Sequence, residues 1–469
     1  MVFSSLIFLF CFLPTVLAAY WLAPKRFRNA VLLAASLVFY AWGGPQYVPI
    51  MLFCAVAAFA GGKCIAFSLQ GGREKAARTG LAVSVVVTLL PLVFFKYFAF
   101  VAESFCALFG LPSPSIPIPL PAGISFYSFQ AVSYLVDVYR GEACVQKNPF
   151  DFCTYIALFP QLVAGPIVRY SKVERQLSMR TETVTDVAEG IRCFVIGLGK
   201  KVLLANNIGL LWESAQALAE KSAATAWIAL AAYTFQIYFD FSGYSDMAVG
   251  LGRIFGFSFP KNFDFPYCSK SVTEFWRRWH ISLGTWFREY IYIPLGGNRG
   301  GTTKTVRNIL VVWMLTGIWH GARWNFVFWG LYYGALLLLE KFVLHRALEK
   351  IPALLRHAYC MFCIMLGWAF FACGSASECT TLVKTLFGAD GVPLDAQAVF
   401  FLRNNAVLFL LCLFGSTHIP MHIGNRLCDR CKNPALRFIM QNGFFVAVLL
   451  LSVAYLVDSS FNPFLYFRF

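Results

Sequence analysis

The sequence Leu315-Thr316-Gly317-Ile318-Trp319-His320-Gly321-Ala322-Arg323-Trp324-Asn325 places a histidine between two long apolar segments, residues 306–314 and 326–339. Ionisable groups at membrane depth are costly, and those that occur there are usually functional. Histidine is the side chain best suited to moving a proton near neutral pH. His320 is therefore a candidate catalytic residue. A packed histidine bonded to a neighbouring carbonyl is the alternative.

The composition is that of a polytopic membrane protein. Of 469 residues, 59% are hydrophobic and only 13% are charged, and the mean hydropathy is +0.64. Apolar runs recur throughout the chain, which predicts an all-α protein with residues 1–469 in a single integral-membrane domain. The net charge of +16 comes from Lys and Arg in short loops. It indicates membrane topology and contact with lipid headgroups rather than nucleic acid.

The positions of the basic residues predict the orientation of the chain, because cytoplasmic loops are rich in Lys and Arg. Lys25, Arg26 and Arg28 mark a first cytoplasmic loop after a span at 6–21, so we expect the N-terminus outside. A second basic loop begins at Lys63. The same reasoning predicts spans at 31–41, 47–60, 81–100, 359–372, 400–414 and 444–456, a Pro-rich outer segment at 111–121 and Phe469 outside.

The middle of the chain does not follow simple crossings. The apolar segment between Arg278 and Arg299 is too short for two spans and is interpreted as re-entrant or interfacial. Residues 306–340 begin and end beside basic residues, which predicts two short helices meeting near His320. Residues 158–167 contain two prolines and cannot form a regular helix. Irregular backbone at membrane depth lines wet cavities, so we expect a funnel open to the cytosol with His320 near its inner end.

Several charged residues lie in apolar surroundings. Asp240 and Asp246 are expected to pair with arginines of later segments, because an unpaired buried carboxylate costs several kcal/mol. Glu274 and Arg278 are four apart, so a helix would bring them together in the favourable order. Lys96 follows two phenylalanines in an apolar run. The Gly-rich basic segment 294–301 is either a hairpin turn or a backbone approach to a phosphorylated ligand.

The cysteines do not indicate a disulfide framework, since many of the 15 lie inside apolar runs. One group has metal-ligand spacing: His418, His422, Cys428 and Cys431. This pattern could bind zinc. A plain basic loop next to a span is the favoured interpretation.

Motifs from about residue 96 to 330 resemble those of the membrane-bound O-acyltransferase family. The likeness is to its bacterial branch, which acetylates alginate or transfers D-alanine to teichoic acid. The stretches that support it are 121–130, 159–166, Asp240-Phe241-Ser242-Gly243-Tyr244-Ser245-Asp246, 275–282, 292–299, Trp319-His320-Gly321 and Phe461-Asn462-Pro463-Phe464.

The resemblance implies about nine to eleven transmembrane helices with re-entrant segments, arranged in a ring around a central tunnel. His320 matches the family's catalytic histidine, and His280 matches the second histidine of the bacterial branch. The resemblance further implies a cytosolic thioester donor, acetyl-CoA, and an extracytoplasmic partner protein that acetylates a glycan. The expected location is a bacterial inner membrane, with neither a metal nor a tightly bound cofactor.

Binding roles follow for residues near the histidines. Arg277 and Arg278 could hold CoA phosphates, or pair with Asp240 and Asp246 instead. Trp319 and Asn325 are further candidates for donor binding. Residues Asp240, Asp246 and Glu274 are interpreted as structural ion-pair partners.

Two other function classes compete with acyl transfer. A transporter also uses broken helices and polar groups at mid-membrane, although the halves of this chain share no motif. A non-catalytic scaffold for polysaccharide secretion is the third class. The acceptor stays open among alginate, another exopolysaccharide, cellulose, peptidoglycan and a protein side chain.

Overall fold

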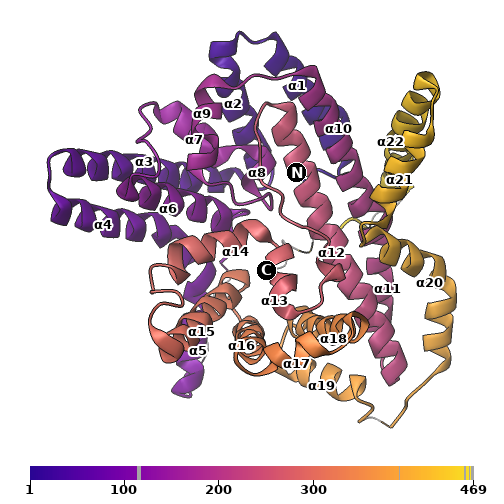
Figure 1. Ribbon diagram of the computed structural model, residues 1–469. Helices are drawn as coiled ribbons and strands as arrows, with labels where there is room; N and C mark the ends of the chain where they lie inside the picture. Colours follow the sequence, from indigo (N-terminus) through magenta and orange to yellow (C-terminus); the bar gives the residue numbers. More distant parts are fainter. Residues whose placement is uncertain (113–117, 390, 459–460, 464, 466–469) are drawn as a thin grey trace. The chain divides into compact units, whose positions relative to one another are not determined.

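The computed structural model describes residues 1–112, 118–389, 391–458, 461–463 and 465 (Figure 1). Every regular element in this part of the chain is a helix, which confirms the all-α prediction. The chain forms two compact units. One comprises Met1–Phe194 and Met247–Pro260, and the other Val195–Asp246 and Lys261–Phe469. Phe464, Phe469 and residues 113–117 of the Pro-rich segment lie outside the described residues.

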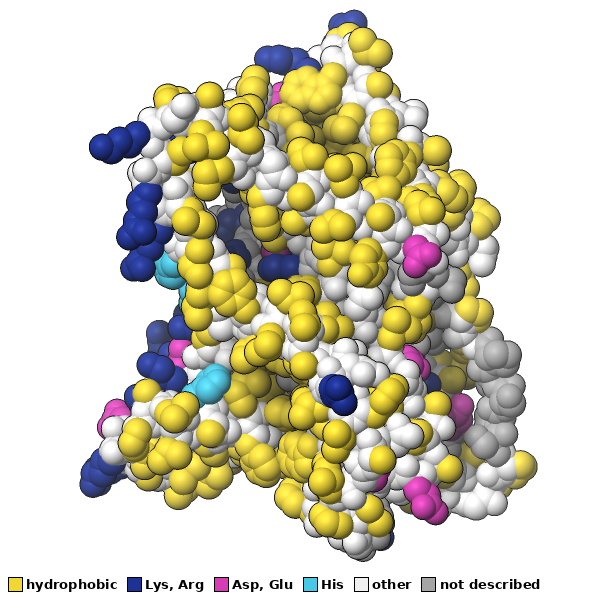
Figure 2. All heavy atoms as spheres, turned by 90° about the vertical axis from the view of Figure 1, so that its right-hand side faces the viewer, with side chains coloured by type: hydrophobic (Ala, Val, Ile, Leu, Met, Phe, Trp, Pro, Cys, Tyr) yellow, Lys and Arg dark blue, Asp and Glu magenta, His cyan; other side chains and the backbone are white. Residues whose placement is uncertain are grey.

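Seven helical stretches among the described residues are long and apolar enough to cross a membrane. They are Pro45–Gln70, Glu74–Leu108, Val184–Gln216, Trp324–Lys350, Ala353–Ala372, Ala396–Gly415 and Pro434–Asp458. The protein is therefore a multi-pass membrane protein. Figure 2 agrees, because hydrophobic side chains cover most of the face it shows.

The spans differ in detail from the sequence prediction. Seven is fewer than the nine to eleven expected, because several further helices are short or polar in composition. The expected first span falls on the shorter apolar helix Phe8–Leu22. The second basic loop begins later than predicted, since Lys63 lies inside a helix that continues to Gln70.

The first unit is built mainly from helices of the N-terminal part, with α3, α4 and α6 packed side by side (Figure 1). Its π-helical and 3-10 segments are η1 (Phe8–Phe12), η2 (Lys25–Phe27), η3 (Pro45–Tyr47) and η4 (Val93–Tyr97). Its α-helices are α1 (Leu13–Leu22), α2 (Arg28–Ala41), α3 (Val48–Gln70), α4 (Glu74–Leu92), α5 (Phe98–Leu108), α6 (Ile124–Arg140), α7 (Pro149–Ala157), α8 (Phe159–Leu162), α9 (Tyr170–Met179) and most of α10 (Val184–Gly199).

Two predictions concern this unit. The proline-containing segment is broken as expected: α7 ends at Ala157, and α8 is a single turn that contains Pro160. Lys96 is held by a polar neighbour, since its Nζ lies 3.2 Å from the hydroxyl of Ser125.

The second unit holds His280 and His320. It begins with η5 (Lys200–Asn206) and α11 (Asn207–Gln216), and it includes most of α12 (Ala223–Ile254). The remaining elements are η6 (Pro266–Cys268), α13 (Val272–Arg278), α14 (Ile281–Phe287), η7 (Arg288–Tyr292), α15 (Gly301–His320), α16 (Trp324–Leu339), η8 (Glu340–Leu344), α17 (His345–Lys350), α18 (Ala353–Ala372), α19 (Ala376–Leu386), α20 (Ala396–Gly415), α21 (Ile419–Arg430) and α22 (Pro434–Asp458).

Local signals explain where the short helix α13 begins. The Ser271 hydroxyl accepts a hydrogen bond from the Glu274 backbone N–H, an N-cap contact. The buried carboxylate of Glu340 accepts from the backbone N–H groups of Val272 and Thr273. These contacts satisfy N–H groups that have no partner within the helix, so α13 has a fixed starting point.

Helices α15 and α16 form a hairpin, as predicted from the sequence around His320, although α15 is longer than the short helix expected. Two glycines let the helices approach closely. A Cβ at Gly317 would collide with the carbonyl oxygen of Phe326, and one at Gly330 would collide with that of Trp313. The absence of side chains at these positions therefore sets the distance between the two helices.

We expect Gly330→Ala to lower the stability of the protein by about 1–3 kcal/mol, the usual cost of overpacking. The added methyl group meets backbone, which cannot move aside as a flexible side chain would. Thermal unfolding in detergent measures the effect. Gly424→Ala is the matched control, because Gly424 has open space around its Cβ position. Equal midpoints for the two variants would contradict close packing at Gly330.

The segment with the four histidine and cysteine residues is mainly helix, not the loop expected. Helix α21 starts with Pro420 in its first turn and contains His422 and Cys428. Apolar residues at 419, 423 and 427 recur at helical spacing, a signal that the metal-ligand interpretation overlooked. Within the described ranges, no group of three or more His, Cys, Asp or Glu side chains could hold a metal ion.

Candidate active site

His320 is the last residue of α15, and only three residues separate it from α16. The side chain is 7% exposed. Its ring packs against three aromatic rings. The centroid distances are 5.0 Å to Trp319 of the same helix, 5.0 Å to Trp329 of α16 and 5.4 Å to Phe371 of α18. The histidine therefore lies in a fixed and largely apolar environment.

His280 connects α13 to α14 and has a left-handed backbone, with φ 45°. Such a conformation is uncommon for a residue with a side chain, and it often occurs at functional sites. The ring is buried and lies edge-on to Phe241, with 4.7 Å between centroids. His280 is outside the seven candidate spans, and burial lowers the pKa of its imidazole. The ring is therefore neutral at physiological pH.

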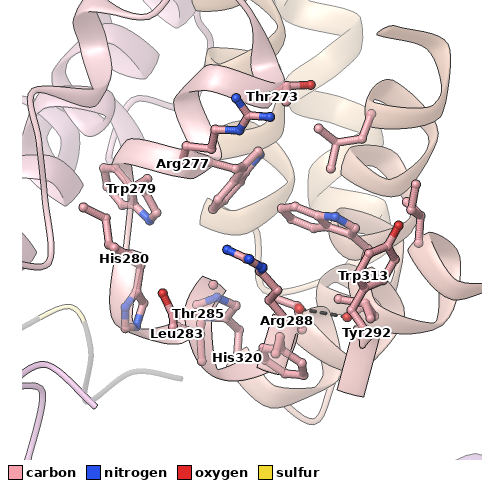
Figure 3. Close-up of a pocket in the computed structure, with 18 residues that line it drawn as sticks. Thr273, Arg277, Trp279, His280, Leu283, Thr285, Arg288, Tyr292, Trp313 and His320 are labelled. Atoms are coloured by element: carbon pink, nitrogen blue, oxygen red, sulfur yellow. Dashed lines mark hydrogen bonds between the residues drawn. The ribbon is translucent and has the colours of Figure 1, made fainter. Parts of the chain in front are cut away.

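The two histidines line one cavity of about 510 Å³. Arg277, Arg288 and Trp313 also contribute to its wall (Figure 3). The two arginines make the cavity positive, while its walls are otherwise mostly apolar. A cavity with few polar groups placed among apolar side chains is the usual form of a small-molecule site.

His320 also lines a second, much smaller cavity of about 20 Å³. The wall of this cavity includes Asp240, Trp329 and Phe371. The imidazole is thus the common boundary of two cavities.

A third cavity, of about 590 Å³, shares Thr273 and Arg277 with the first. Its wall carries further basic side chains, Lys270, Lys341 and Arg356, together with the carboxylates of Glu274, Glu340 and Glu349. The shared lining makes Arg277 the charged residue that joins the two cavities. A ligand with anionic groups at one end could occupy both.

The acidic residues form ion pairs, but not all with the partners expected. Glu274 pairs with Arg278 at 2.8 Å, as predicted. The expectation that Asp240 and Asp246 pair with later arginines is wrong. Asp240 binds Lys201 and Asp246 binds Lys200, each at 2.7 Å. These two consecutive lysines lie in π-helical η5, which brings them against α12.

Three candidate donor-binding residues lie outside the wall of the large cavity. Arg278 contacts Glu274 and the carbonyl oxygen of Asp264. Trp319 is buried, and Asn325 donates a hydrogen bond of 2.8 Å to the carbonyl oxygen of Cys373. The structure therefore gives Asn325 a contact that holds the start of α16 to the end of α18.

Sequence reasoning did not single out two residues of this site. Arg288 lines the large cavity, and Asn262 contacts His280. Asn262 lies 18 positions before His280, so no local pattern connects the two.

Comparison with known proteins supports the resemblance. The model of the membrane-bound O-acyltransferase family matches residues 127–379. A protein named probable alginate O-acetylase AlgI from Azotobacter vinelandii is 40% identical over 501 aligned residues, covering 100% of both chains. A peptidoglycan O-acetyltransferase from Helicobacter pylori is 30% identical, covering 100% of this chain and 98% of its own. A teichoic acid D-alanyltransferase from Bacillus subtilis is 28% identical over 55% of this chain and 67% of its own. The family model matches more than half of the chain, and relatives of 40% and 30% identity cover all of it, so this chain belongs to the membrane-bound O-acyltransferase family and is an O-acyltransferase.

Proposed function

We propose that the protein takes an acetyl group from cytosolic acetyl-CoA and passes it across a bacterial inner membrane for O-acetylation of an extracytoplasmic polysaccharide. The observation that carries this proposal is the position of His320 between two cavities. The larger one carries the positive charges of Arg277 and Arg288, which suits an anionic donor. The smaller one, of about 20 Å³, also touches the imidazole and has room for one water-sized group, such as an acceptor hydroxyl.

The chemistry required is the attack of a hydroxyl on a thioester carbonyl. A base must take the hydroxyl proton, and donors must stabilise the oxyanion that develops. His320 is assigned as the base. Arg288, on the cavity wall, is assigned to the oxyanion, and Arg277, which also lines the third cavity, to the phosphates of the donor. A narrow site also excludes water and limits hydrolysis of the thioester.

The polysaccharide acceptor is supported by the names of the relatives, two of which refer to alginate and peptidoglycan. Alginate is the first candidate, because two relatives with that name are 40% and 37% identical over the whole chain, against 30% for the peptidoglycan O-acetyltransferase. In line with the resemblance, a separate extracytoplasmic protein is proposed to complete the transfer. The distribution of basic loops supports an N-terminus outside.

Proteoliposomes that contain labelled acetyl-CoA on the cytosolic face test the proposal. CoA release and appearance of label on an acceptor added to the opposite face are expected together. Release that depends on the acceptor side would support transfer across the membrane. Absence of CoA release, with glycan and partner protein both supplied, would move the assignment to a transporter or a scaffold.

Arg277→Ala is expected to raise the KM for acetyl-CoA by about 10–100-fold, which corresponds to losing a charge-assisted hydrogen bond of about 1.5–3 kcal/mol. Within the described part of the chain Arg277 makes no hydrogen bond or ion pair, so its guanidinium is available to phosphates. Steady-state kinetics measure the effect.

Arg278→Ala is the matched control, because Arg278 is held by Glu274. A second donor, S-acetylpantetheine, lacks the nucleotide phosphates and should show the same KM with wild type and Arg277→Ala. An equal loss with both donors would contradict phosphate binding by Arg277.

A further inference from the structure

The backbone around His280 is clamped by a neighbouring segment. The carbonyl oxygen of Asn262 accepts a hydrogen bond of 2.9 Å from the Ile281 N–H, and the Asp264 N–H donates one of 2.9 Å to the Arg278 carbonyl. The two bonds lie on either side of His280. Its left-handed conformation costs roughly 1–2 kcal/mol, so contacts of this kind are needed to maintain it.

The side chain of Asn262 completes the clamp. It is 2% exposed. Its Oδ1 accepts from the backbone N–H of Ser282 at 3.1 Å and from the Ser282 hydroxyl at 2.9 Å. A backbone N–H can only donate, so the atom facing it must be the amide oxygen rather than the amide nitrogen. This fixes the orientation of the amide.

The same oxygen lies 3.2 Å from Nδ1 of His280. An amide oxygen cannot donate a hydrogen bond, so Nδ1 must carry the proton. Because burial lowers the pKa of the ring, the ring is neutral and carries only that one proton. Its second nitrogen, Nε2, therefore holds the lone pair. The bond made by one ring nitrogen determines what the other can do.

We propose that Asn262 is a positioning residue for acyl transfer: it fixes His280 in the Nδ1–H tautomer and thereby makes Nε2 a hydrogen-bond acceptor. In the other tautomer Nε2 would be a donor, unable to accept from a hydroxyl. The catalytic consequence rests on the proposed function, whereas the tautomer does not.

The tautomer of His280 can be measured by NMR, independently of any enzyme assay. The chain has six histidines, so ¹⁵N-histidine labelling gives few signals, and His280→Gln identifies the relevant one. We expect a protonated Nδ1 and an unprotonated Nε2 in the wild type, and loss of this preference in Asn262→Ala. Ser282→Ala removes the hydroxyl that donates to Oδ1 of Asn262 but leaves Asn262 in place, so the tautomer preference should remain. A protonated Nε2 in the wild type would overturn the proposal, whatever the enzyme assay shows.

Activity provides the second readout. Asn262→Ala should lower kcat by about 10–100-fold, as for partners that orient metal-bound histidines, with a smaller change in KM. Asn405→Ala removes the same amide from α20 and should not change kcat. Adding Asn262→Ala to His280→Gln should cost nothing more, because residues that act as a unit are not additive. Full additivity would overturn the positioning role.

A third variant separates positioning from mere packing. In Asn262→Asp a carboxylate faces Nδ1–H, which favours the imidazolium and raises the pKa of His280. The ring then remains protonated to a higher pH, so the acidic limb of the rate profile should move upward. The other titratable groups lining the cavity are Arg277, Arg288, Tyr292 and His320, and the substitution leaves them in place. An unshifted profile would contradict the contact.

Discussion

His320→Gln should lower the rate of acetyl transfer by about 10²–10⁴-fold, the usual contribution of a general base. Glutamine keeps much of the size of the side chain but cannot accept a proton near neutral pH. The loss should appear in kcat, because His320 acts on the acceptor hydroxyl in the transition state rather than on donor binding. Release of CoA from acetyl-CoA in proteoliposomes measures it.

The control for this variant is His357→Gln. His357 belongs to α18, lines none of the three cavities described, and makes a 3.0 Å contact with the carbonyl oxygen of Ser269. It is partly buried, like many structural histidines, so it tests whether removing any such ring reduces activity. Equal rates for the wild type and His320→Gln, with both proteins folded, would remove His320 from the mechanism.

The features of the site that local sequence could predict are those determined by neighbours along the chain. The position of His320 between two apolar segments identified it as a candidate catalytic residue. The basic residues at both ends of 306–340 predicted the hairpin. The spacing of Glu274 and Arg278 predicted their ion pair, because four residues separate partners on one helix face. The apolar segment between Arg278 and Arg299 is too short for two crossings, which is also a local property. Each of these inferences needs no knowledge of distant contacts.

The features that escaped prediction depend on tertiary packing. Asp240 and its partner Lys201 are 39 positions apart in sequence, and the charge pattern alone allowed several basic partners. The contact between Asn262 and His280 depends on two loop segments with no periodicity. The segment of α21 contains two patterns: polar residues at metal-ligand spacing and apolar residues at helical spacing. The prediction followed the first pattern, whereas the second indicates the helix. For Asp240 the need for a buried counter-charge was identified correctly, but the fold determined which basic residue supplies it.

Lys201→Met is expected to destabilise the protein by about 3–5 kcal/mol, because it leaves the Asp240 carboxylate buried without its counter-charge. The side chains of Lys201 and Asp240 are only 2% and 3% exposed. The ammonium group also binds the side chain of Asn206 and the carbonyl oxygen of Pro463, while Asp240 accepts from the Leu465 N–H. Thermal unfolding in detergent measures the loss.

The adjacent lysine is a close control. Lys200 pairs with Asp246 at the same distance of 2.7 Å, but these side chains are 22% and 29% exposed. Lys200→Met should therefore cost no more than about 1 kcal/mol, as for solvated pairs. A similar loss for the two variants would show that burial does not determine the strength of these pairs.

Replacing both members of the buried pair should restore stability. In Lys201→Met/Asp240→Leu both charges of this pair are removed from the core. Apolar replacements of buried ion pairs are often neutral or stabilising. Activity need not return with stability, because Asp240 and His320 line the same small cavity. With Lys201 alone removed, the uncompensated carboxylate would stabilise a protonated His320, which cannot act as a base. The ion pair therefore provides a carboxylate in the wall of the cavity that His320 also lines, without adding net charge there. A double variant that is stable but slow would separate this role from folding.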